Sequence, residues 1–254
     1  MPIRMAALIL VGGAVISGHS AVAAADLTLF ETGFESPGYV AGQQLGGQGL
    51  WSVDSAWNVN APYATISTTG AATGNQCLRL DGAGMVNPFP PGTSAIWGVY
   101  LQATLASPFR PLDAGLPVLI LEADVFVQGL SSSGFLNLQL RGSQSFGAQA
   151  AIGPSGDLGA YHHLMLTANY ATQRFSTQVD GNVIGPPESF FWYDSGDISS
   201  VVIFFGAQMP HSSVCLIDNL SLRAVPAAPE GALLGCAAWS LLTRRRRPSV
   251  RCLS

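Results

Sequence analysis

The sequence predicts an all-β fold, an antiparallel β-sandwich, from three observations. Short runs alternate apolar and polar residues, turn-forming residues interrupt the chain about every ten positions, and no long stretch keeps a helical period. Alternation with a period of two turns one side of each strand toward a core and the other toward solvent. Many short strands at this spacing are typical of sandwiches and barrels.

The predicted strands all fall within residues 26–224, which we assign to one domain. The alternating or β-branched runs are Thr65–Thr68, Cys77–Leu80, Val118–Val127, Phe135–Leu140, Leu164–Asn169, Arg174–Val179, Ser199–Phe205 and Val214–Leu222. Asp81-Gly82 and Asp180-Gly181 stand where hairpin turns are expected, because glycine adopts positive φ without steric cost.

The order of several short motifs resembles the concanavalin A-like (laminin-G-like) jelly roll. An opening segment Phe34–Tyr39 precedes Gly159–Leu164, where Tyr161 replaces the tryptophan of the family's Trp-His-His pattern. A Val-Asp-Gly hairpin at Val179–Val183 follows, and Leu216–Leu220 matches the closing segment. The resemblance implies a sandwich in which the last strand pairs beside the first.

Charge is distributed very unevenly along the chain. The formal net charge is −4, with charged residues at only 10% and hydrophobic residues at 48%. Residues 26–224 hold 14 acidic residues, five arginines and no lysine, so the predicted domain carries a net charge of −9. An acidic surface excludes a nucleic-acid binder that works by neutralising phosphates, because such a protein needs a basic face.

The first 25 residues predict a secretory signal helix. Arg4 supplies the positive start, Ala6–Ile16 is an apolar run, and small residues at Ala21–Ala25 provide a cleavage site. The apolar run is too short for a membrane anchor, which needs about 20 residues.

Residues 225–254 predict a C-terminal sorting tail. Pro226, Pro229 and Glu230 precede a short hydrophobic helix at Gly231–Leu242, and a basic cluster follows at Arg244, Arg245, Arg246 and Arg247. A twelve-residue helix is only about 18 Å long, which makes a permanent span doubtful. The tail resembles a PEP-CTERM sorting signal, although Pro-Ala-Ala-Pro-Glu stands where that family has Pro-Glu-Pro. The resemblance implies a membrane exosortase as partner and transient anchoring before release at the cell surface.

Two groups of residues resemble catalytic groups, but neither is complete. Glu122 and Asp124 share one face of a strand, as paired carboxylates of jelly-roll glycoside hydrolases do, but Phe126 and Val127 occupy the places of the third acid. His162 and His163 are adjacent, so on a strand they face opposite sides and cannot act at one site. We therefore expect no catalytic residue.

The sequence also suggests a disulfide bond and a calcium site. Cys77 and Cys215 are the only cysteines in residues 26–224, and export favours a disulfide between them if their strands are neighbours. Two buried free thiols are the alternative. Sandwiches that this chain resembles often hold a structural calcium ion, which takes oxygen ligands. The candidate ligands are Glu35, Asp81, Asp218 and Asn219.

Aromatic side chains in or beside segments rich in glycine and proline are the candidates for binding sugar. Rings stack on the apolar face of a pyranose, and polar groups beside them bind its hydroxyls. The candidates are Trp97, Tyr100, Trp192 and Tyr193. The alternative is that these rings pack in the core or beneath long loops, because large rings are usually buried.

The sequence as a whole favours an exported, cell-surface-sorted and non-catalytic module for adhesion or for the extracellular matrix. Extracellular polysaccharide is the expected ligand, and nucleic acid is not a partner. Two alternatives stay open, a degenerate or unrecognised glycoside hydrolase and a purely structural envelope protein.

Overall fold

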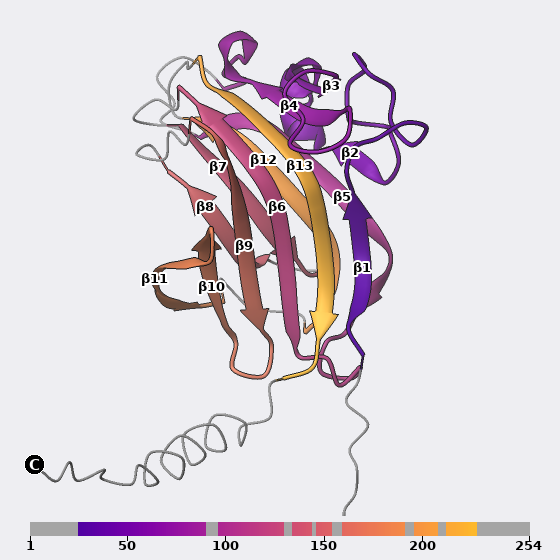
Figure 1. Ribbon diagram of the computed structural model, residues 1–254, viewed down its shortest axis with the longest axis vertical. Coiled ribbons are helices and arrows are strands. Elements are labelled where there is room, and N and C mark those ends of the chain that lie inside the picture. The colour runs from indigo at the N-terminus through magenta and orange to yellow at the C-terminus, as the bar shows by residue number, and fades with distance from the viewer. Residues whose placement is uncertain are drawn as a thin grey trace, which may run out of the picture.

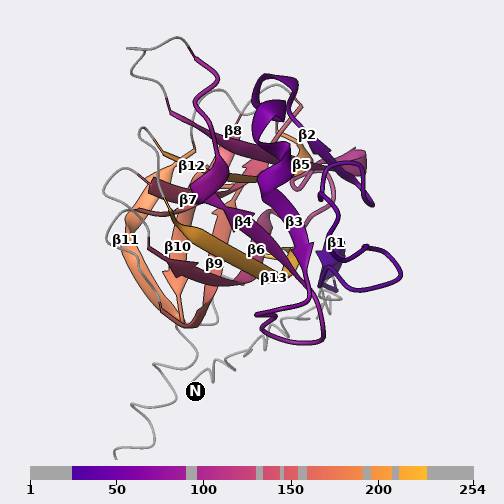
Figure 2. The same cartoon turned by 90° about the horizontal axis from the view of Figure 1, so that it is seen from above.

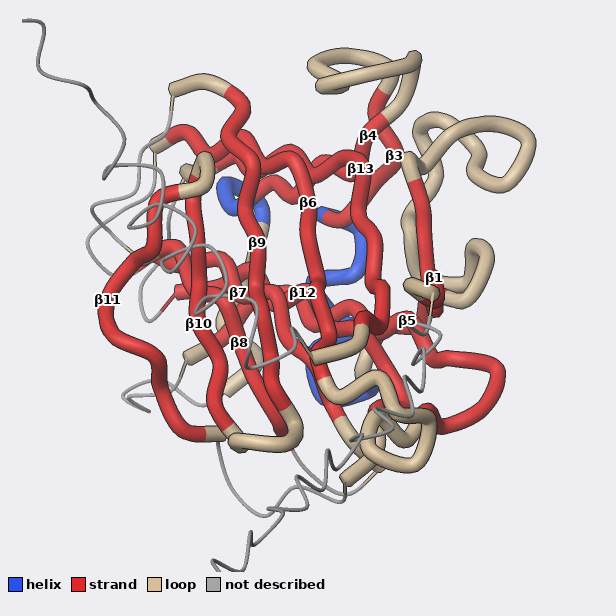
Figure 3. Tube along the Cα trace, turned by 60° about the horizontal axis from the view of Figure 1, so that its bottom comes forward, coloured by secondary structure: helices blue, strands red, loops and turns tan. Residues whose placement is uncertain are grey.

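A computed structural model describes residues 25–89, 96–129, 134–143, 146–153, 159–190, 196–207 and 212–227. These residues fold into strands joined by turns and two short 3-10 segments, η1 (Ser55–Tyr63) and η2 (Gly82–Gly84) (Figure 3). The strands are β1 (Leu27–Thr32), β2 (Trp51–Val53), β3 (Ala64–Ser67), β4 (Cys77–Asp81), β5 (Trp97–Phe109), β6 (Val118–Gln128), β7 (Gly134–Arg141), β8 (Phe146–Ile152), β9 (Tyr161–Asn169), β10 (Arg174–Val179), β11 (Asn182–Ser189), β12 (Ile198–Ala207) and β13 (Val214–Val225).

The strands form two antiparallel sheets packed face to face (Figures 1 and 2). The eight-stranded sheet has the order β11-β10-β9-β6-β13-β4-β3, with β1 also paired to β13, and the five-stranded sheet has the order β2-β5-β12-β7-β8. The predicted all-β antiparallel sandwich is therefore confirmed. The finer resemblance to the laminin-G-like family stays a prediction.

The core lies between the sheets and follows the alternation seen in the sequence. In β6, Leu121, Ala123 and Val125 are buried, whereas Glu122 and Asp124 lie on the outer face and are partly exposed. Each large apolar side chain removed from water in this way contributes about 1.5–3 kcal/mol. Burial of one face fixes the register, because a shift by one residue would turn that whole face outward.

Some strands escape sequence prediction for identifiable reasons. The first five residues of β5, starting at Trp97, are all buried, so apolar and polar positions do not alternate there. In β11 every residue is exposed and Pro186-Pro187 lies at the edge of the sheet, a place where proline breaks no internal ladder. The Asp180-Gly181 turn is confirmed, since both residues have positive φ, 50° and 76°. Asp81-Gly82 forms no hairpin, because Asp81 instead caps η2.

The two ends of the domain emerge side by side. Leu27 of β1 pairs with Ala224 of β13, as the expected pairing of first and last strands requires. The predicted signal helix and the hydrophobic helix at Gly231–Leu242 lie outside the described residues. So do Pro229, Glu230 and the arginine cluster of the sorting signal, whereas Pro226 directly follows β13. In the part of the chain that the structure describes, no helix is long and apolar enough to cross a membrane.

Strand β13 changes neighbours halfway along its length. Its first half pairs with β4 up to Ile217, its second half pairs with β1 from Leu220, and the register with β6 shifts between them. At this break Asn219 has a φ of 49°, a left-handed conformation that asparagine tolerates better than most residues. Beside this break, the carboxylate of Asp218 lies between Gly33, which follows β1, and the loop of Ala72 and Thr73, which leads into β4; this is the gap between the two strands.

Asp218 fills that gap with a fully buried carboxylate, 0% exposed. Its oxygens accept hydrogen bonds from the backbone N–H groups of Ala72, Thr73 and Asn219, at 3.1, 3.0 and 2.8 Å. Glu35 accepts from the N–H groups of Asn75 and Gln76 in the same way, at 2.8 and 3.0 Å. The two carboxylates therefore hold the loop that leads into β4.

Replacing Asp218 by alanine is expected to lower the free energy of unfolding by about 3 kcal/mol, because two loop N–H groups lose their acceptor inside the protein. Denaturant unfolding measures the loss. Asp113→Ala is the control, since its ion pair with Arg110 spans 3.7 Å and both side chains are about 70% exposed. We expect that control to change stability by less than about 0.5 kcal/mol. Equal effects of the two substitutions would contradict the role given to Asp218.

Candidate functional site

The predicted sugar-binding rings occupy very different places. Trp97 is 1% exposed and its ring belongs to the core between the sheets. This corrects the expectation that Trp97 stacks on a sugar, because a buried ring has no free face. Tyr100 lies on the opposite face of the same strand but is also buried, 7% exposed, in a cluster with Val202 and Phe204, so its ring has no free face for a sugar either. Trp192 and Tyr193 are outside the described residues.

Tyr100 belongs to a small aromatic cluster on the outer face of the five-stranded sheet. Its ring centroid lies 5.9 Å from that of Phe204, and Phe204 lies 5.3 Å from Phe135 in an edge-to-face contact. The three residues come from β5, β12 and β7, adjacent strands whose register places Tyr100, Phe204 and Asn137 in one row. The Tyr100 hydroxyl accepts a 2.7 Å hydrogen bond from Arg141 Nη1.

Amide and hydroxyl side chains fill the rows beside this cluster. Cross-strand pairing aligns Gln102 of β5, Val202 of β12, Gln139 of β7 and Gln149 of β8, and directly paired residues lie on the same face. The next row holds Thr104, Ser200 and Arg141. We call this surface the amide face, defined by the residues Tyr100, Gln102, Thr104, Phe135, Asn137, Gln139, Arg141, Gln149, Ser200, Val202 and Phe204.

The amide face is almost free of charge. Within the five strands of this sheet Arg141 is the one charged residue. Arg141 is partly buried and hydrogen-bonded to Tyr100, and burial raises the pKa of the Tyr100 hydroxyl above its ordinary value. The face therefore carries neutral hydrogen-bonding groups and one partly exposed ring, Phe135, beside the buried rings of Tyr100 and Phe204.

Three polar atoms of the amide face have no hydrogen-bond partner. Among the described residues, the buried side-chain atoms that lack one include Asn137 Oδ1, Gln139 Oε1 and Ser200 Oγ. Gln139 is only 5% exposed. An acceptor that is neither solvated nor bonded costs free energy, so its retention calls for an explanation such as a ligand. The alternation in Phe135–Leu140 predicts that Asn137 and Gln139 share a face. No feature of the sequence predicts that their side-chain oxygens lack partners.

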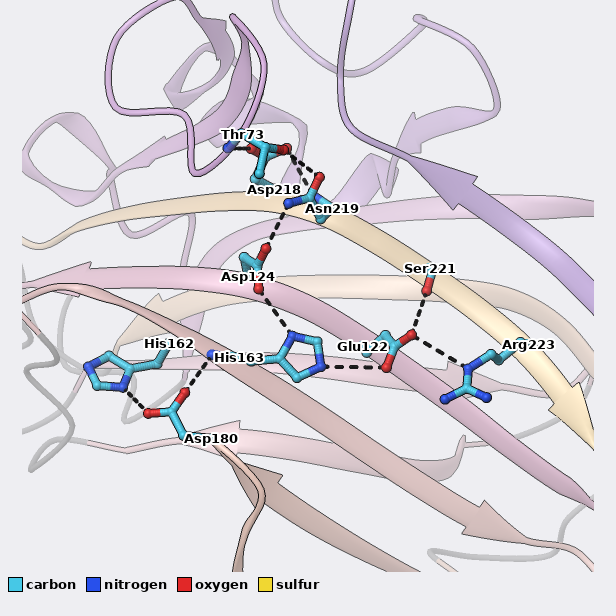
Figure 4. A network of polar contacts seen from close by, with 10 residues as sticks. All are labelled: Thr73, Glu122, Asp124, His162, His163, Asp180, Asp218, Asn219, Ser221 and Arg223. Atoms are coloured by element: carbon cyan, nitrogen blue, oxygen red, sulfur yellow. Dashed lines mark hydrogen bonds and ion pairs between the residues drawn. The ribbon is translucent and has the colours of Figure 1, made fainter.

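The outer face of the other sheet carries a charged network instead (Figure 4). His163 of β9 lies between two carboxylates of β6, with Nδ1 3.1 Å from Asp124 Oδ1 and Nε2 3.5 Å from Glu122 Oε2. The remaining oxygens are also occupied. Asn219 Nδ2 donates to Asp124 Oδ2 at 2.7 Å. Glu122 Oε1 accepts from the Ser221 hydroxyl at 3.3 Å and forms an ion pair with Arg223 Nε at 3.5 Å.

This arrangement ties up the carboxylates that a glycoside hydrolase would need. That chemistry requires one carboxylate that attacks or activates water and one that donates a proton. Here each of the four oxygens of Glu122 and Asp124 has a protein partner. These contacts link strands β9, β6 and β13.

His162 and His163 have separate partners, as their alternation on the strand requires. His162 Nδ1 lies 2.6 Å from Asp180 Oδ2, and the backbone N–H of His163 donates to Asp180 Oδ1 at 2.9 Å. Asp180 thereby links the β9 strand to the β10–β11 turn. The hydrogen bond from His162, followed by that from the His163 backbone, lowers the pKa of the Asp180 carboxyl from its ordinary value of 3.8.

The four predicted calcium ligands do not form one site. Glu35, Asp218 and Asn219 gather around the loop before β4, where Asn219 Oδ1 accepts from the Thr73 hydroxyl at 2.9 Å. Asp81 is bound elsewhere, to Arg79 Nη2 at 2.8 Å. The described residues contain no group of three or more acidic, histidine or cysteine side chains able to hold a metal ion. In this structure the oxygens serve backbone N–H groups.

Cys77 and Cys215 are buried free thiols. Their strands are neighbours, as expected, but Cys215 pairs with Leu80 and not with Cys77, three residues away. Cys215 belongs to the core, and the alternation of β4 turns Cys77 toward the opposite face of the sheet. The disulfide expectation is therefore wrong for this structure, because bridged Cα atoms lie within about 7 Å with side chains that point at each other.

We predict that an alkylating reagent leaves Cys77 and Cys215 unmodified in the native protein and modifies both after unfolding without reductant. Burial protects the thiols and raises both pKa values, which reduces the reactive thiolate. Peptide mass spectrometry reads out each cysteine separately. A peptide pair joined through Cys77 and Cys215 would contradict this prediction.

The Asp180→Asn variant is expected to lose stability at neutral pH and to match the wild type in acid. A carboxyl with a lowered pKa stabilises the fold above its unfolded-state pKa, and this contribution disappears as the pH falls through the folded value. Asparagine keeps the left-handed turn. Thermal unfolding from about pH 6 to pH 2 measures the difference. A gap between the two proteins that widens toward low pH would contradict the assignment.

No protein-family model matches the sequence, and no curated protein matches it. Among solved structures, a sialidase is 14% identical with a TM-score of 0.46, and the match covers 81% of this chain but 20% of the sialidase. The alginate lyase AlgAT5 from Polysaccharide Lyase family 7 is 10% identical over 69% of this chain and 94% of its own, with a TM-score of 0.45. The CBM22-1 xylan-binding domain from Paenibacillus barcinonensis Xyn10C is 15% identical over 80% and 98%, with a TM-score of 0.38. Similarity at this level assigns no activity to the chain.

Proposed function

We propose that this sandwich is a non-catalytic carbohydrate-binding module that binds neutral polysaccharide on the amide face. The observation that carries the proposal is the set of unpaired acceptors, Asn137 Oδ1, Gln139 Oε1 and Ser200 Oγ, beside Phe135, the partly exposed ring of a cluster in which Tyr100 and Phe204 are buried. Sugar hydroxyls donate to such acceptors, and the C–H face of a pyranose packs against aromatic rings.

The charge of the amide face selects the class of polysaccharide. Anionic glycans are bound through arginine and lysine, which recognise carboxylates and sulfates by charge-assisted hydrogen bonds. In the strands of this sheet the single cation, Arg141, already donates to Tyr100. Asn137, Gln139 and Gln149 are neutral amides, each able both to donate and to accept. The face thus suits a chain of neutral sugars.

Absence of catalysis is supported by the charged network on the opposite sheet. Its two carboxylates, Glu122 and Asp124, are held by His163, Asn219, Ser221 and Arg223. A hydrolase site on that sheet would have to release at least one of them. The module therefore binds polysaccharide and leaves it intact.

The proposal places the module at the outer surface of the cell. The apolar leader of residues 1–25 directs export, and the tail of residues 225–254 is a substrate for an exosortase. In the extracellular matrix the domain then serves adhesion. Fractionation of cells with and without the arginine cluster, residues 244–247, tests this part by following the module from the envelope to the medium.

The Gln139→Leu variant is the sharpest test of the amide face. Leucine keeps the size of the side chain and removes its hydrogen-bonding groups, so neutral-polysaccharide binding is expected to weaken roughly tenfold. The same change removes an unpaired buried acceptor, so the free energy of unfolding should stay within about 1 kcal/mol or rise. Affinity electrophoresis in gels that contain neutral polysaccharides measures the first effect, and denaturant unfolding measures the second.

The matched control is Gln178→Leu on β10, which pairs with Met165 on the outer face of the eight-stranded sheet. That variant should bind like the wild type. Binding that is unaffected by Gln139→Leu would overturn the amide face as the site. An array of neutral and acidic glycans that stays blank would favour a purely structural envelope protein, and reducing-sugar release from β-glucans would favour a hydrolase.

A further inference from the structure

We propose that a second, separate sugar-binding site lies on the other sheet, in the depression between η1, β3, β4 and η2. The depression has a volume of about 460 Å³, and its walls include Pro62, Tyr63, Thr65, Arg79, Asp81 and Gly84. Thr65 and Arg79 are paired across β3 and β4, so both project from the outer face of the eight-stranded sheet. No residue of the amide face contributes to it.

The wall of the depression is an aromatic ring held in a fixed position. Tyr63 ends η1 and is half-buried, with Pro62 exposed beside it. The ring packs so closely on Gly84 that a Cβ at position 84 would overlap it. Glycine is therefore required there by the ring, and the ring is positioned before any ligand arrives. A preordered ring costs little entropy when a sugar stacks on it.

The polar groups of the depression are an arginine and an aspartate that already face each other. Arg79 Nη2 donates to Asp81 Oδ2 at 2.8 Å, and Asp81 Oδ1 accepts from the backbone N–H of Ala83 at 3.1 Å. Both side chains are about one-third exposed, 37% and 34%. Asp81 has further contacts within the protein, and the exposed third of its side chain can accept from sugar hydroxyls, while Arg79 keeps further N–H groups to donate.

This combination of groups fits a neutral hexopyranose with neighbouring hydroxyls. One hydroxyl donates to the carboxylate of Asp81, the next accepts from the guanidinium of Arg79, and the apolar side of the sugar ring packs on Tyr63. An acidic sugar is attracted by Arg79 but repelled by Asp81. A cationic ligand is attracted by Asp81 but repelled by Arg79. The balanced pair therefore selects an uncharged ligand.

The position of the depression allows the module to bridge two polysaccharide chains. The depression lies near the start of β13, where Val214 pairs with Asp81, and Val225 is at the other end of that strand. Strand β13 runs along the length of the sandwich (Figure 1). Twelve residues of strand separate these ends by about 35 Å. The two sites occupy opposite sheets, so one module can hold two polysaccharide chains at once. This bridging role rests on the proposed function, whereas the second site itself does not.

Titration of the full-length chain with methyl hexopyranosides tests the second site. The probes are methyl β-D-glucopyranoside, methyl β-D-galactopyranoside and methyl α-D-mannopyranoside, and the signal is the Nε–H resonance of Arg79, assigned by its loss in Arg79→Lys. At least one probe is expected to shift this resonance in a saturable way with a Kd of about 1–10 mM. Tyr63→Ala should weaken binding at least about fivefold, and Tyr63→Phe should keep it.

Further variants separate this site from the amide face. Asp81→Asn should weaken the titration, whereas Gln139→Leu should leave it unchanged even though it impairs polysaccharide binding. Three results would overturn the second site: no probe moves the Arg79 resonance, Tyr63→Ala binds like the wild type, or Gln139→Leu abolishes the shift. A methyl glucuronide that binds more than tenfold tighter than every neutral probe would overturn the neutral ligand class.

Discussion

The partner exchange of strand β13 at Asp218 is the constraint on which the rest of the structure depends. One strand in the middle of the larger sheet pairs first with β4 and then with β1, and a buried carboxylate closes the gap between them. Pairing with β4 positions the Tyr63–Arg79 depression at one end of the sandwich. Pairing with β1 brings both ends of the domain together at the other.

The two sheets divide the chemistry of the surface between them. The larger sheet gathers charge in a network where His163 bridges Glu122 and Asp124 (Figure 4). The smaller sheet carries rings, amides and hydroxyls with a single arginine. A charged network that satisfies its own members stabilises the sheet, whereas the amide oxygens of Asn137 and Gln139 have no partner within the described residues.

The sequence contained enough information for the sheet class but not for the site. Alternation in β6 and β9 identified strands, because a half-buried strand needs it. The sequence offers Trp97 and Tyr100 as equal candidates for a sugar-binding ring. Their places depend on the alternation and register of β5, which turn Trp97 into the core between the sheets and Tyr100 toward the amide face. The predicted disulfide is wrong for the same reason: the sequence predicts neighbouring strands, but the offset that separates Cys77 from Cys215 depends on register. Unpaired acceptors are a property of three-dimensional packing and leave no pattern in the sequence.

The central claim is that the amide face binds neutral polysaccharide. The most direct measurement is the NMR shift of the side-chain amides of Asn137 and Gln139 while neutral oligosaccharides are titrated into the protein. Binding at the amide face predicts that both amide signals move together and saturate. Saturable binding that leaves both signals in place would contradict the account.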